Sequence, residues 1–410
     1  MELHTQLILL YGLYTLLRIG LELREINFIY KNLDKPVLLS PQKYWKAGYY
    51  RISKHIEESL RIFFHFFLFS IWIGGGLTLL NYLIYDGTEW SEMAIVASFF
   101  GINLFLLFPL TILDKLIDRK FGIWKGNWIL FIVDTLKTFS LIVVFGTPVA
   151  YGVIYFVENF DYWWLYSFFL FFGMVLFLNL LFPYLILWFN KLQPLEEGEL
   201  KKRIEKLLTS AGFSSGGVFI IDTSKRESRL NAFFSGFGKS KRIILFDNLM
   251  EKLTSDEIVA VLGHELGHFK NRDVWKRLVV SGGLLFIIFY LLGHISPIFY
   301  LQLRLFENGA TLLALIYLFL EPLIFVIQPF LNYFYQQGEF SADLEGTKII
   351  HSHHLISALK KLVEENIAFP RVSNLYSTLY YTHPPVLERI ERLEKGIKKT
   401  DSESQREKNG

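Results

Sequence analysis

The sequence predicts an all-α polytopic membrane protein with seven transmembrane helices and a smaller α+β region outside the membrane. Three observations predict this fold class. First, 52% of the 410 residues are hydrophobic and 17% are aromatic, which exceeds the usual share in soluble domains. Second, these residues lie in long uninterrupted runs rather than in stripes of period 2 or 3.6. Third, two segments have ordinary soluble composition, roughly 191–277 and 335–410.

Seven apolar runs are long enough to cross a hydrocarbon core of about 30 Å, which takes about 20 helical residues. They lie roughly at 3–23, 62–85, 93–113, 129–157, 163–190, 278–303 and 311–334. The first run has no basic lead-in and no small-residue cleavage site after it. We therefore expect it to be a retained membrane span and not a signal peptide.

The connections between the runs alternate in charge. Residues 24–61, 114–128 and 191–277 are rich in Lys and Arg, whereas 86–92 and 158–162 carry acids and neither Lys nor Arg. Basic connections face the cytoplasm in membrane proteins. The N-terminus is thus expected outside and both soluble segments in the cytoplasm, with a bacterial inner membrane or an endoplasmic reticulum as the host. A net charge of +3 gives no strongly basic field, so we expect no nucleic-acid partner.

These spans and loops predict a division of the chain into five parts. They are five transmembrane helices in 1–190, a cytoplasmic catalytic segment in 191–277, helices six and seven in 278–334, a second cytoplasmic catalytic segment in 335–400, and a disordered tail in 401–410.

The first cytoplasmic segment alternates helix and strand patterns. A helical pattern over 195–212 ends at Gly212, and β-like runs follow at 218–222 and 242–246 with a third strand and turn expected within 231–240. Further on, Thr254 and Glu257 fit a T-x-x-E capping box, so another helix should begin near Ser255. A small sheet beside helices is therefore expected here.

The helix that begins near Ser255 carries VLGHELGHFKNRD at residues 261–273. His264 and His268 are four residues apart, so they share a helix face and two imidazole nitrogens can bind one ion. Glu265 lies beside them and can reach a water on that ion. The chain has no cysteine, so a metal must be held by His and carboxylates. This HExxH pattern predicts one Zn²⁺ per chain, the alternative being two histidines on the surface of an amphipathic helix.

A catalytic zinc needs a third protein ligand and an open position for water. Glu339 is the best candidate, because it follows the last apolar run on the same side of the membrane as His264 and His268. Asp343 lies one helical turn further on and could accept a hydrogen bond from the second ring nitrogen of a ligand histidine. Rival third ligands are Glu321, Glu345, His351, His353 and His354.

Several polar residues lie inside the apolar runs. They are His65, Asn103, Asp134, Lys137, Asn179, His294 and Glu321. Each could be satisfied locally within the helix bundle. Together they also suggest that part of the bundle faces water.

Four short stretches carry a resemblance to a known family. They are NAFFSG at 231–236, GHELGHFKNRD at 263–273, EFSAD at 339–343 and THPPVLERIERL at 382–393. With seven predicted spans in the matching order, the chain resembles the type I CAAX prenyl endopeptidases, which are integral-membrane zinc metalloproteases. The resemblance covers nearly the whole chain. It implies a gluzincin-like catalytic region and a large water-filled chamber with the zinc at its cytoplasmic end.

The resemblance also implies a role for each residue of the site. It gives His264, His268 and Glu339 as metal ligands, Glu265 as the catalytic acid and base, Asp343 as the support of a ligand, and Asn231, Ala232, His383 and Arg389 as substrate contacts. Taken by themselves, residues 231–236 could be an ordinary strand or an edge strand that pairs with an extended substrate. His383 could merely end a loop, or could donate to a developing oxyanion. Arg389 would suit a peptide carboxylate.

These features predict a zinc-dependent membrane endopeptidase that cuts near the C-terminus of prenylated CAAX-type substrates. Its partners would be prenylated or other membrane-associated proteins and the lipid bilayer. A general quality-control metalloprotease with no need for a prenyl group is the alternative within the enzyme class. From other classes, a channel or transporter, or a non-catalytic binding protein, would also have seven spans, although an intact HExxH argues against both.

Overall fold

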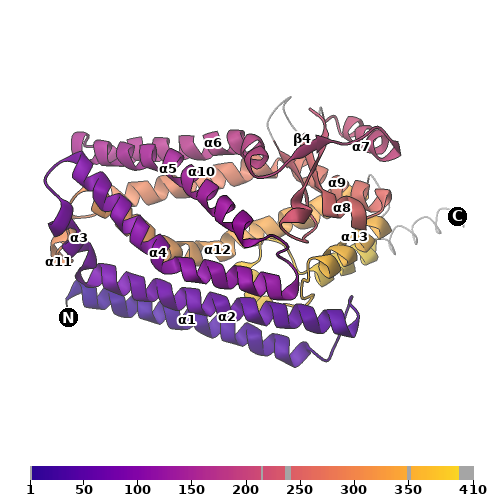
Figure 1. Ribbon diagram of the computed structural model, residues 1–410, viewed down its shortest axis with the longest axis horizontal. Coiled ribbons are helices and arrows are strands. Elements are labelled where there is room, and N and C mark those ends of the chain that lie inside the picture. Colours follow the sequence, from indigo (N-terminus) through magenta and orange to yellow (C-terminus); the bar gives the residue numbers. More distant parts are fainter. Residues whose placement is uncertain (1, 214–215, 236–241, 349–351, 397–410) are drawn as a thin grey trace, which may run out of the picture.

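The computed structural model describes residues 2–213, 216–235, 242–348 and 352–396, and it is mostly helical. Within these described residues, seven helices are long and apolar enough to cross a membrane. They are α1 Leu3–Asn32, α2 Pro41–Ile71 with its continuation α3 Leu77–Ile84, α4 Glu89–Phe121, α5 Trp128–Asn159, α6 Trp163–Phe189, α10 Asp273–Leu292 and α12 Gly309–Thr347. Figure 1 shows these helices running along the long axis, with the sheet at one end. The predicted fold class is confirmed.

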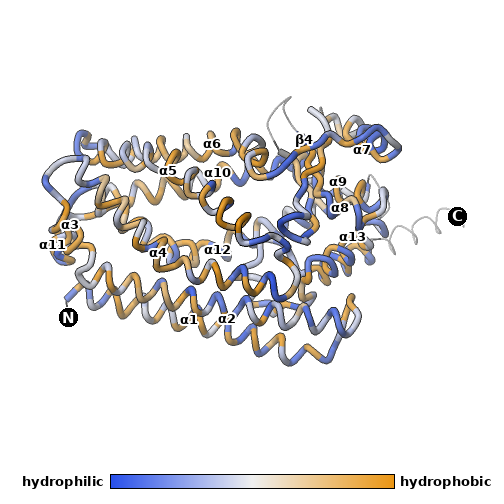
Figure 2. The backbone as a smooth tube through the Cα atoms, in the orientation of Figure 1, coloured by the Kyte–Doolittle hydropathy of each residue, from blue (hydrophilic) through white to orange (hydrophobic). Residues whose placement is uncertain are grey.

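The hydropathy of the chain follows this arrangement. Figure 2 shows hydrophobic residues along the long helices and a larger share of hydrophilic residues at the end that holds α7 and the sheet. Large apolar side chains such as Phe105, Val279 and Phe330 remain exposed on the long helices. An exposed apolar surface of this extent fits contact with lipid.

Several helices extend beyond the predicted apolar runs, and the sixth and seventh also differ where the site lies. The sixth was expected over 278–303, but α10 begins at Asp273 and ends at Leu292, and a separate short helix, α11 Pro297–Gln302, follows. The break has a local cause: Ser296 caps α11 by accepting a hydrogen bond from the Ile298 N–H, and Pro297 occupies its first turn. The seventh, α12, continues past 334 to Thr347, so the last span and the candidate third ligand share one helix.

The small sheet has four strands in the order β1-β2-β4-β3. They are β1 Leu192–Pro194, β2 Val218–Ile221, β3 Ala232–Ser235 and β4 Arg242–Phe246. β2 and β4 are parallel, whereas β1 pairs with β2 and β3 pairs with β4 in antiparallel fashion. The three predicted strands are confirmed, and β1 was not predicted. The expected turn after β3 lies outside the described residues, as does the tail 401–410.

Helices cover the sheet and form one hydrophobic core with it. They are α7 Glu199–Ser210, α8 Asp247–Lys252 and α9 Ser255–Lys270, with α13 Ser352–Glu365 packed on the other side of α9. Ile258, Leu262 and Leu266 of α9 are almost fully buried in this core. Their i, i+4, i+8 spacing puts them on one face of α9, which leaves another face for the polar residues of the site.

Candidate metal centre

The helix that carries the HExxH sequence begins where the capping box predicted. The Glu257 N–H donates to Thr254 Oγ1 at 3.3 Å, and the Thr254 N–H donates to Glu257 Oε2 at 2.7 Å. Both bonds of the capping box are therefore made, and α9 starts at Ser255. This prediction is confirmed.

Small residues let α9 and α12 touch backbone to backbone. Gly267 lies so close to α12 that a Cβ atom there would meet the Ala342 Cα at 2.7 Å. One turn earlier, a Cβ on Gly263 would lie 3.5 Å from the Gly346 Cα. Two small residues four apart on each helix form a smooth stripe that permits this approach. The stripe runs beside His264, so it brings the α9 histidines to the acids of α12.

The two helices bring three ligand groups together. One nitrogen of His264, one nitrogen of His268 and one carboxylate oxygen of Glu339 all lie within 4.8 Å of one another. Glu339 Oε2 is 3.4 Å from His264 Nε2, and Glu339 Oε1 is 3.1 Å from His268 Nε2. Two imidazoles and one carboxylate form a typical donor set for zinc in a catalytic site.

The burial of Glu339 supports a bound cation. Its side chain has no exposure to solvent, and neither carboxylate oxygen has a hydrogen-bond partner among the described residues. A buried carboxylate without hydrogen bonds is costly unless a positive charge compensates it. A metal ion between the histidine Nε2 atoms and Glu339 would compensate it, so the residues fit a metal.

A carboxylate contacts the outer nitrogen of each histidine. Asp343 Oδ1 is 2.8 Å from His264 Nδ1, and Asp273 Oδ2 is 2.9 Å from His268 Nδ1. An Nδ1–H that donates to a carboxylate leaves the lone pair on Nε2, the nitrogen that faces Glu339. Both histidines are therefore oriented for metal binding.

The acids that orient the histidines are themselves held by cations. Arg389 donates to both oxygens of Asp343, from Nε at 2.8 Å and from Nη2 at 2.6 Å. Lys276 Nζ lies 3.2 Å from Asp273 Oδ1. The Arg389 side chain is almost buried, so its bidentate pair with Asp343 is the more rigid of the two.

Two further residues face the same space. Glu265 and His383 line a cavity of about 1090 Å³ together with His268 and Glu339. Burial raises the pKa of the Glu265 carboxyl, while the neighbouring histidines oppose this rise. His383 keeps 64% of its side chain exposed, and its Nδ1 lies 2.8 Å from Glu339 Oε2. A carboxylate and an imidazole thus border the space in which a peptide bond would meet the metal.

Comparisons with known proteins identify the family. Residues 194–397 match Peptidase family M48, and residues 35–191 match the CAAX prenyl protease N-terminal domain with its five membrane helices. The chain is 33% identical over 299 residues to CAAX prenyl protease 1 of Saccharomyces cerevisiae, covering 68% of this chain and 66% of that protein. It is 35% identical over 292 residues to the CAAX prenyl protease 1 homolog of Arabidopsis thaliana, covering 70% of this chain and 69% of that protein. The chain belongs to the CAAX prenyl protease 1 family.

A solved structure extends the likeness of this CAAX prenyl protease 1 family member to its whole fold. The crystal structure of S. mikatae Ste24p superposes with a TM-score of 0.87 at 25% identity and covers 96% of this chain and 99% of that one. The protein is thus an integral multi-pass membrane protein of a metalloendopeptidase family.

The rivals of Glu339 lie in other surroundings in this family member. Glu321 pairs with Arg18 and His65, and Glu345 pairs with Lys270 and Lys348. His353 and His354 stack on each other in α13, and His351 lies outside the described residues. Among the described residues, only His264, His268 and Glu339 form a group that could hold a metal ion.

Asn231 and Ala232 lie at the free edge of the sheet. Ala232 begins β3, which pairs with β4 on one side only, and the Asn231 carbonyl accepts a hydrogen bond from the Phe246 N–H at 3.1 Å. Arg389, predicted to meet a peptide carboxylate, binds the carboxylate of Asp343 in the structure, and its contact with a substrate stays a prediction.

Sequence reasoning missed Asp273. This residue closes the quoted GHELGHFKNRD stretch and lies five positions after His268, just beyond the end of α9. Its carboxylate reaches back to His268 because the chain turns at Arg272, which has a positive φ of 56°, before α10 begins. The signal was present as an acid shortly after the second histidine, but the reversal of the chain was not visible from spacing.

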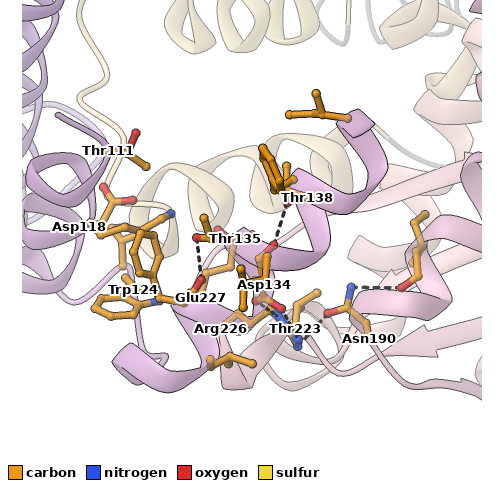
Figure 3. Close-up of a pocket in the computed structure, with 18 of the residues that line it drawn as sticks. Thr111, Asp118, Trp124, Asp134, Thr135, Thr138, Asn190, Thr223, Arg226 and Glu227 are labelled. Atoms are coloured by element: carbon orange, nitrogen blue, oxygen red, sulfur yellow. Dashed lines mark hydrogen bonds and ion pairs between the residues drawn. The ribbon is translucent and has the colours of Figure 1, made fainter. Parts of the chain in front are cut away.

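The polar residues inside the spans have local partners. His65 contacts Glu321, Asn179 donates to the Val175 carbonyl, and Lys137 donates to the Trp188 carbonyl. Figure 3 shows Asp134 beside Arg226 at one end of a second, larger cavity, with the Arg226 Nε 3.0 Å from Asp134 Oδ2. This cavity has a volume of about 1370 Å³ and lies among α4, α5, α6 and the sheet. Partnered polar groups thus border open space in the bundle.

Proposed function

We propose that this protein is a zinc-dependent endopeptidase that cuts near the C-terminus of prenylated CAAX-type proteins. One observation carries the proposal: His264, His268 and Glu339 converge within 4.8 Å, beside Glu265, in a chain of the CAAX prenyl protease 1 family. The relatives' names supply the substrate class. The donor set and the carboxylate of Glu265 beside it supply the chemistry of the reaction.

The proposed metal site has Zn²⁺ held by His264, His268 and Glu339, one ion per chain. Zinc in such a site acts as a Lewis acid and makes its water acidic enough to attack a peptide carbonyl near neutral pH. Asp343 and Asp273 keep the histidines in the tautomer that binds metal, as their contacts of 2.8 and 2.9 Å with the two Nδ1 atoms support.

The proton transfers fall to Glu265. It takes the proton from the attacking water and later delivers it to the leaving amine, so no covalent enzyme intermediate is needed. A carboxyl whose pKa is raised by burial suits both halves of this task, because it takes up and releases a proton closer to neutral pH. His383 is the proposed donor to the oxyanion that forms at the scissile carbonyl.

The edge strand β3 is the proposed platform for the peptide. Asn231 and Ala232 would offer backbone groups to an extended substrate, as edge strands do in other peptide-binding proteins. β3 lies in contact with α9, so a peptide along this strand would pass the HExxH helix.

The larger cavity supports a prenylated substrate. Its walls carry apolar side chains of α4 and α5, such as Phe105, Phe131 and Ile142. Phe233 and Phe234 of β3 line both this cavity and the cavity of the metal centre. An isoprenoid chain attached next to the scissile bond would therefore find apolar surface beside β3.

The proposed orientation puts the metal centre in the cytoplasm. The site is formed by α9, which lies within the basic segment 191–277, and by the part of α12 beyond the predicted span 311–334, and basic connections favour the cytoplasmic side. CAAX motifs are prenylated at a cysteine near the C-terminus of the chain. A bacterial inner membrane or an endoplasmic reticulum would fit this orientation.

The test uses purified protein in detergent with a farnesylated CAAX peptide and its unprenylated twin. Metal-dependent release of the last three residues from the farnesylated peptide is expected, abolished by a chelator and by Glu265→Gln, which should retain its metal. Equal cleavage of both peptides would instead indicate general turnover of membrane proteins. Cleavage that persists in Glu265→Gln would refute the proposed mechanism.

A further inference from the structure

The proposed function leaves one group of the substrate without a partner. A CAAX substrate ends in a free carboxylate three residues beyond the prenylated cysteine. Arg389 is the residue that sequence reasoning assigned to it. In the structure the Arg389 guanidinium donates hydrogen bonds to both oxygens of Asp343, and only 11% of the Arg389 side chain is exposed. Its Nη1 lies 3.7 Å from Glu339 Oε2, so this guanidinium already faces two carboxylates of the site, and a cation without an acid would suit the substrate carboxylate better.

The wall of the cavity of the metal centre carries several cations. Lys270, Arg272, Arg277 and Lys348 line it, on the same cavity as Glu265 and His383. Lys270 and Lys348 share the carboxylate of Glu345.

The two arginines are different from the lysines. Arg272 and Arg277 are exposed, and neither forms an ion pair with a carboxylate within the described part of the chain. The Arg277 guanidinium lies over the Tyr335 ring, 4.7 Å from its centre, a contact that uses no N–H acceptor. Two guanidinium groups without an acid thus face the cavity that contains the catalytic carboxylate.

We propose that Arg272 and Arg277 bind the free C-terminal carboxylate of the substrate. This inference rests on the proposed function and deepens it, because it makes the free carboxylate a determinant of specificity. A guanidinium presents parallel N–H donors that match the two oxygens of a carboxylate, which a lysine ammonium does not.

Arg272 lies close in the chain to the metal centre. Three extended residues span about 10 Å, which sets how far the carboxylate lies from the scissile bond. Arg272 follows the ligand His268 by four residues, directly before Asp273, which contacts His268. The rest of the cavity wall includes Phe213, Phe269 and Val274, apolar surface for the two residues between the cleavage point and the C-terminus.

The experiment compares two farnesylated CAAX peptides that differ only at the C-terminus, one with a free carboxylate and one with an amide. We would measure kcat/KM for each with the wild-type protein, Arg272→Gln, Arg277→Gln and the double variant. The wild type should prefer the carboxylate by about 10- to 100-fold, the range of a hydrogen bond to a charged group. In the double variant this preference should fall towards one. Lys202→Gln, at an exposed lysine of α7 away from the cavity, is the matched control and should keep the wild-type preference.

Each outcome decides the inference. A wild type that cuts both peptides equally, or a double variant that keeps the full preference, would overturn it. Equal losses on both peptides in the double variant would also overturn it, because a purely structural role has that effect. If neither farnesylated peptide is cut in a Glu265-dependent way, the proposed function itself fails, and that result is distinct from a loss of carboxylate preference.

Discussion

Two glutamates of α12 show how the same side chain serves two purposes in one molecule. Glu321 and Glu339 are 18 residues apart, about five turns and 27 Å of an ideal helix. Glu321 has a fixed cation beside it: Arg18 Nη1 lies 3.0 Å from its Oε1, and His65 Nδ1 lies 2.6 Å from its Oε2. Glu339 has three histidines as its nearest neighbours, and its fixed cation is more distant, since Arg389 Nη1 lies 3.7 Å from its Oε2.

The cation beside each glutamate distinguishes a structural carboxylate from a candidate metal ligand. Arg18 keeps its charge at any accessible pH, so it compensates Glu321 without any further group. Imidazoles whose outer nitrogens donate to Asp343 and Asp273 present lone pairs to Glu339, and lone pairs do not compensate a carboxylate. Arg389 binds Asp343 through Nε and Nη2 and approaches Glu339 only to 3.7 Å, so it compensates Glu339 in part, and the proposed zinc would supply the remaining positive charge.

The largest effect is expected from removing Glu339. Glu339→Ala should lose the bound metal and reduce peptide cleavage by about 10³-fold or more, because two histidines alone leave the metal site incomplete. Metal content by mass spectrometry and kcat/KM on a farnesylated peptide would measure both. Glu321→Gln is the matched control on the same helix and should keep its metal. Full metal occupancy in Glu339→Ala would mean that another residue is the third ligand.

Smaller losses are expected at the acids that orient the histidines. Asp343→Ala and Asp273→Ala should each weaken metal binding by about 10- to 100-fold, because each removes the acceptor of one Nδ1–H. The loss should be greater for Asp343, since its replacement also leaves Arg389 almost buried without its carboxylate. Competition with a chelator of known affinity would measure the change. Wild-type affinity in Asp273→Ala would mean that the His268 contact only stabilises the start of α10.

The sequence predicted those parts of the site that depend on local pattern. The capping box placed the start of α9 at Ser255, and the i, i+4 spacing placed His264 and His268 on one face. The spans were predictable for the same reason, because length and hydropathy are local properties. The third residue of the cluster, Glu339, was also chosen in advance, since it follows the last span on the expected side.

The remaining parts depend on contacts between distant segments. The close approach of α9 and α12 depends on Gly267 lying against Ala342, and each glycine alone looks like a weak point in a helix. The pairing of Arg389 with Asp343 was not predicted, because the two residues are 46 positions apart in the sequence. The long α12 was divided at 334 because composition changes there, although the helix itself continues. A single sequence contains no direct record of these pairings.

Replacing Glu321 should affect the stability of the protein and not its catalysis. Glu321→Gln should leave metal content unchanged and cleavage within about threefold, while it lowers the free energy of unfolding by ~2 kcal/mol. The cost stays moderate because Arg18 retains Glu58, 3.1 Å from its Nη2. Thermal unfolding in detergent would measure it. The double variant Arg18→Gln with Glu321→Gln should lose less than the sum of the two single losses, because the two residues share one interaction.

The smallest effect is expected at Glu257 of α9. Like Glu321, it is a carboxylate paired with a cation of the chain, so its removal should change stability. Glu257 is 3% exposed, accepts hydrogen bonds from Lys361 Nζ at 2.7 Å and Ser357 Oγ at 2.6 Å, and takes part in the capping box. Although burial opposes it, these contacts lower the pKa of the Glu257 carboxyl. Glu257→Gln should therefore cost ~1 kcal/mol of stability at pH 7, since Lys361 is partly exposed and its pair with Glu257 is partly screened.

The pH dependence of that cost separates charge from packing. Because the folded pKa lies below the unfolded value of about 4.3, the stabilisation by Glu257 is present above pH 4.3 and disappears as the pH falls through the folded pKa. The difference in Tm between wild type and Glu257→Gln should hold from pH 7 to pH 5 and shrink below about pH 4. Glu251→Gln, at an exposed acid of α8, should show no such difference. A difference that persists unchanged at pH 3.5 would attribute the effect to the shape of the capping box, and Glu257 would then differ in kind from Glu321.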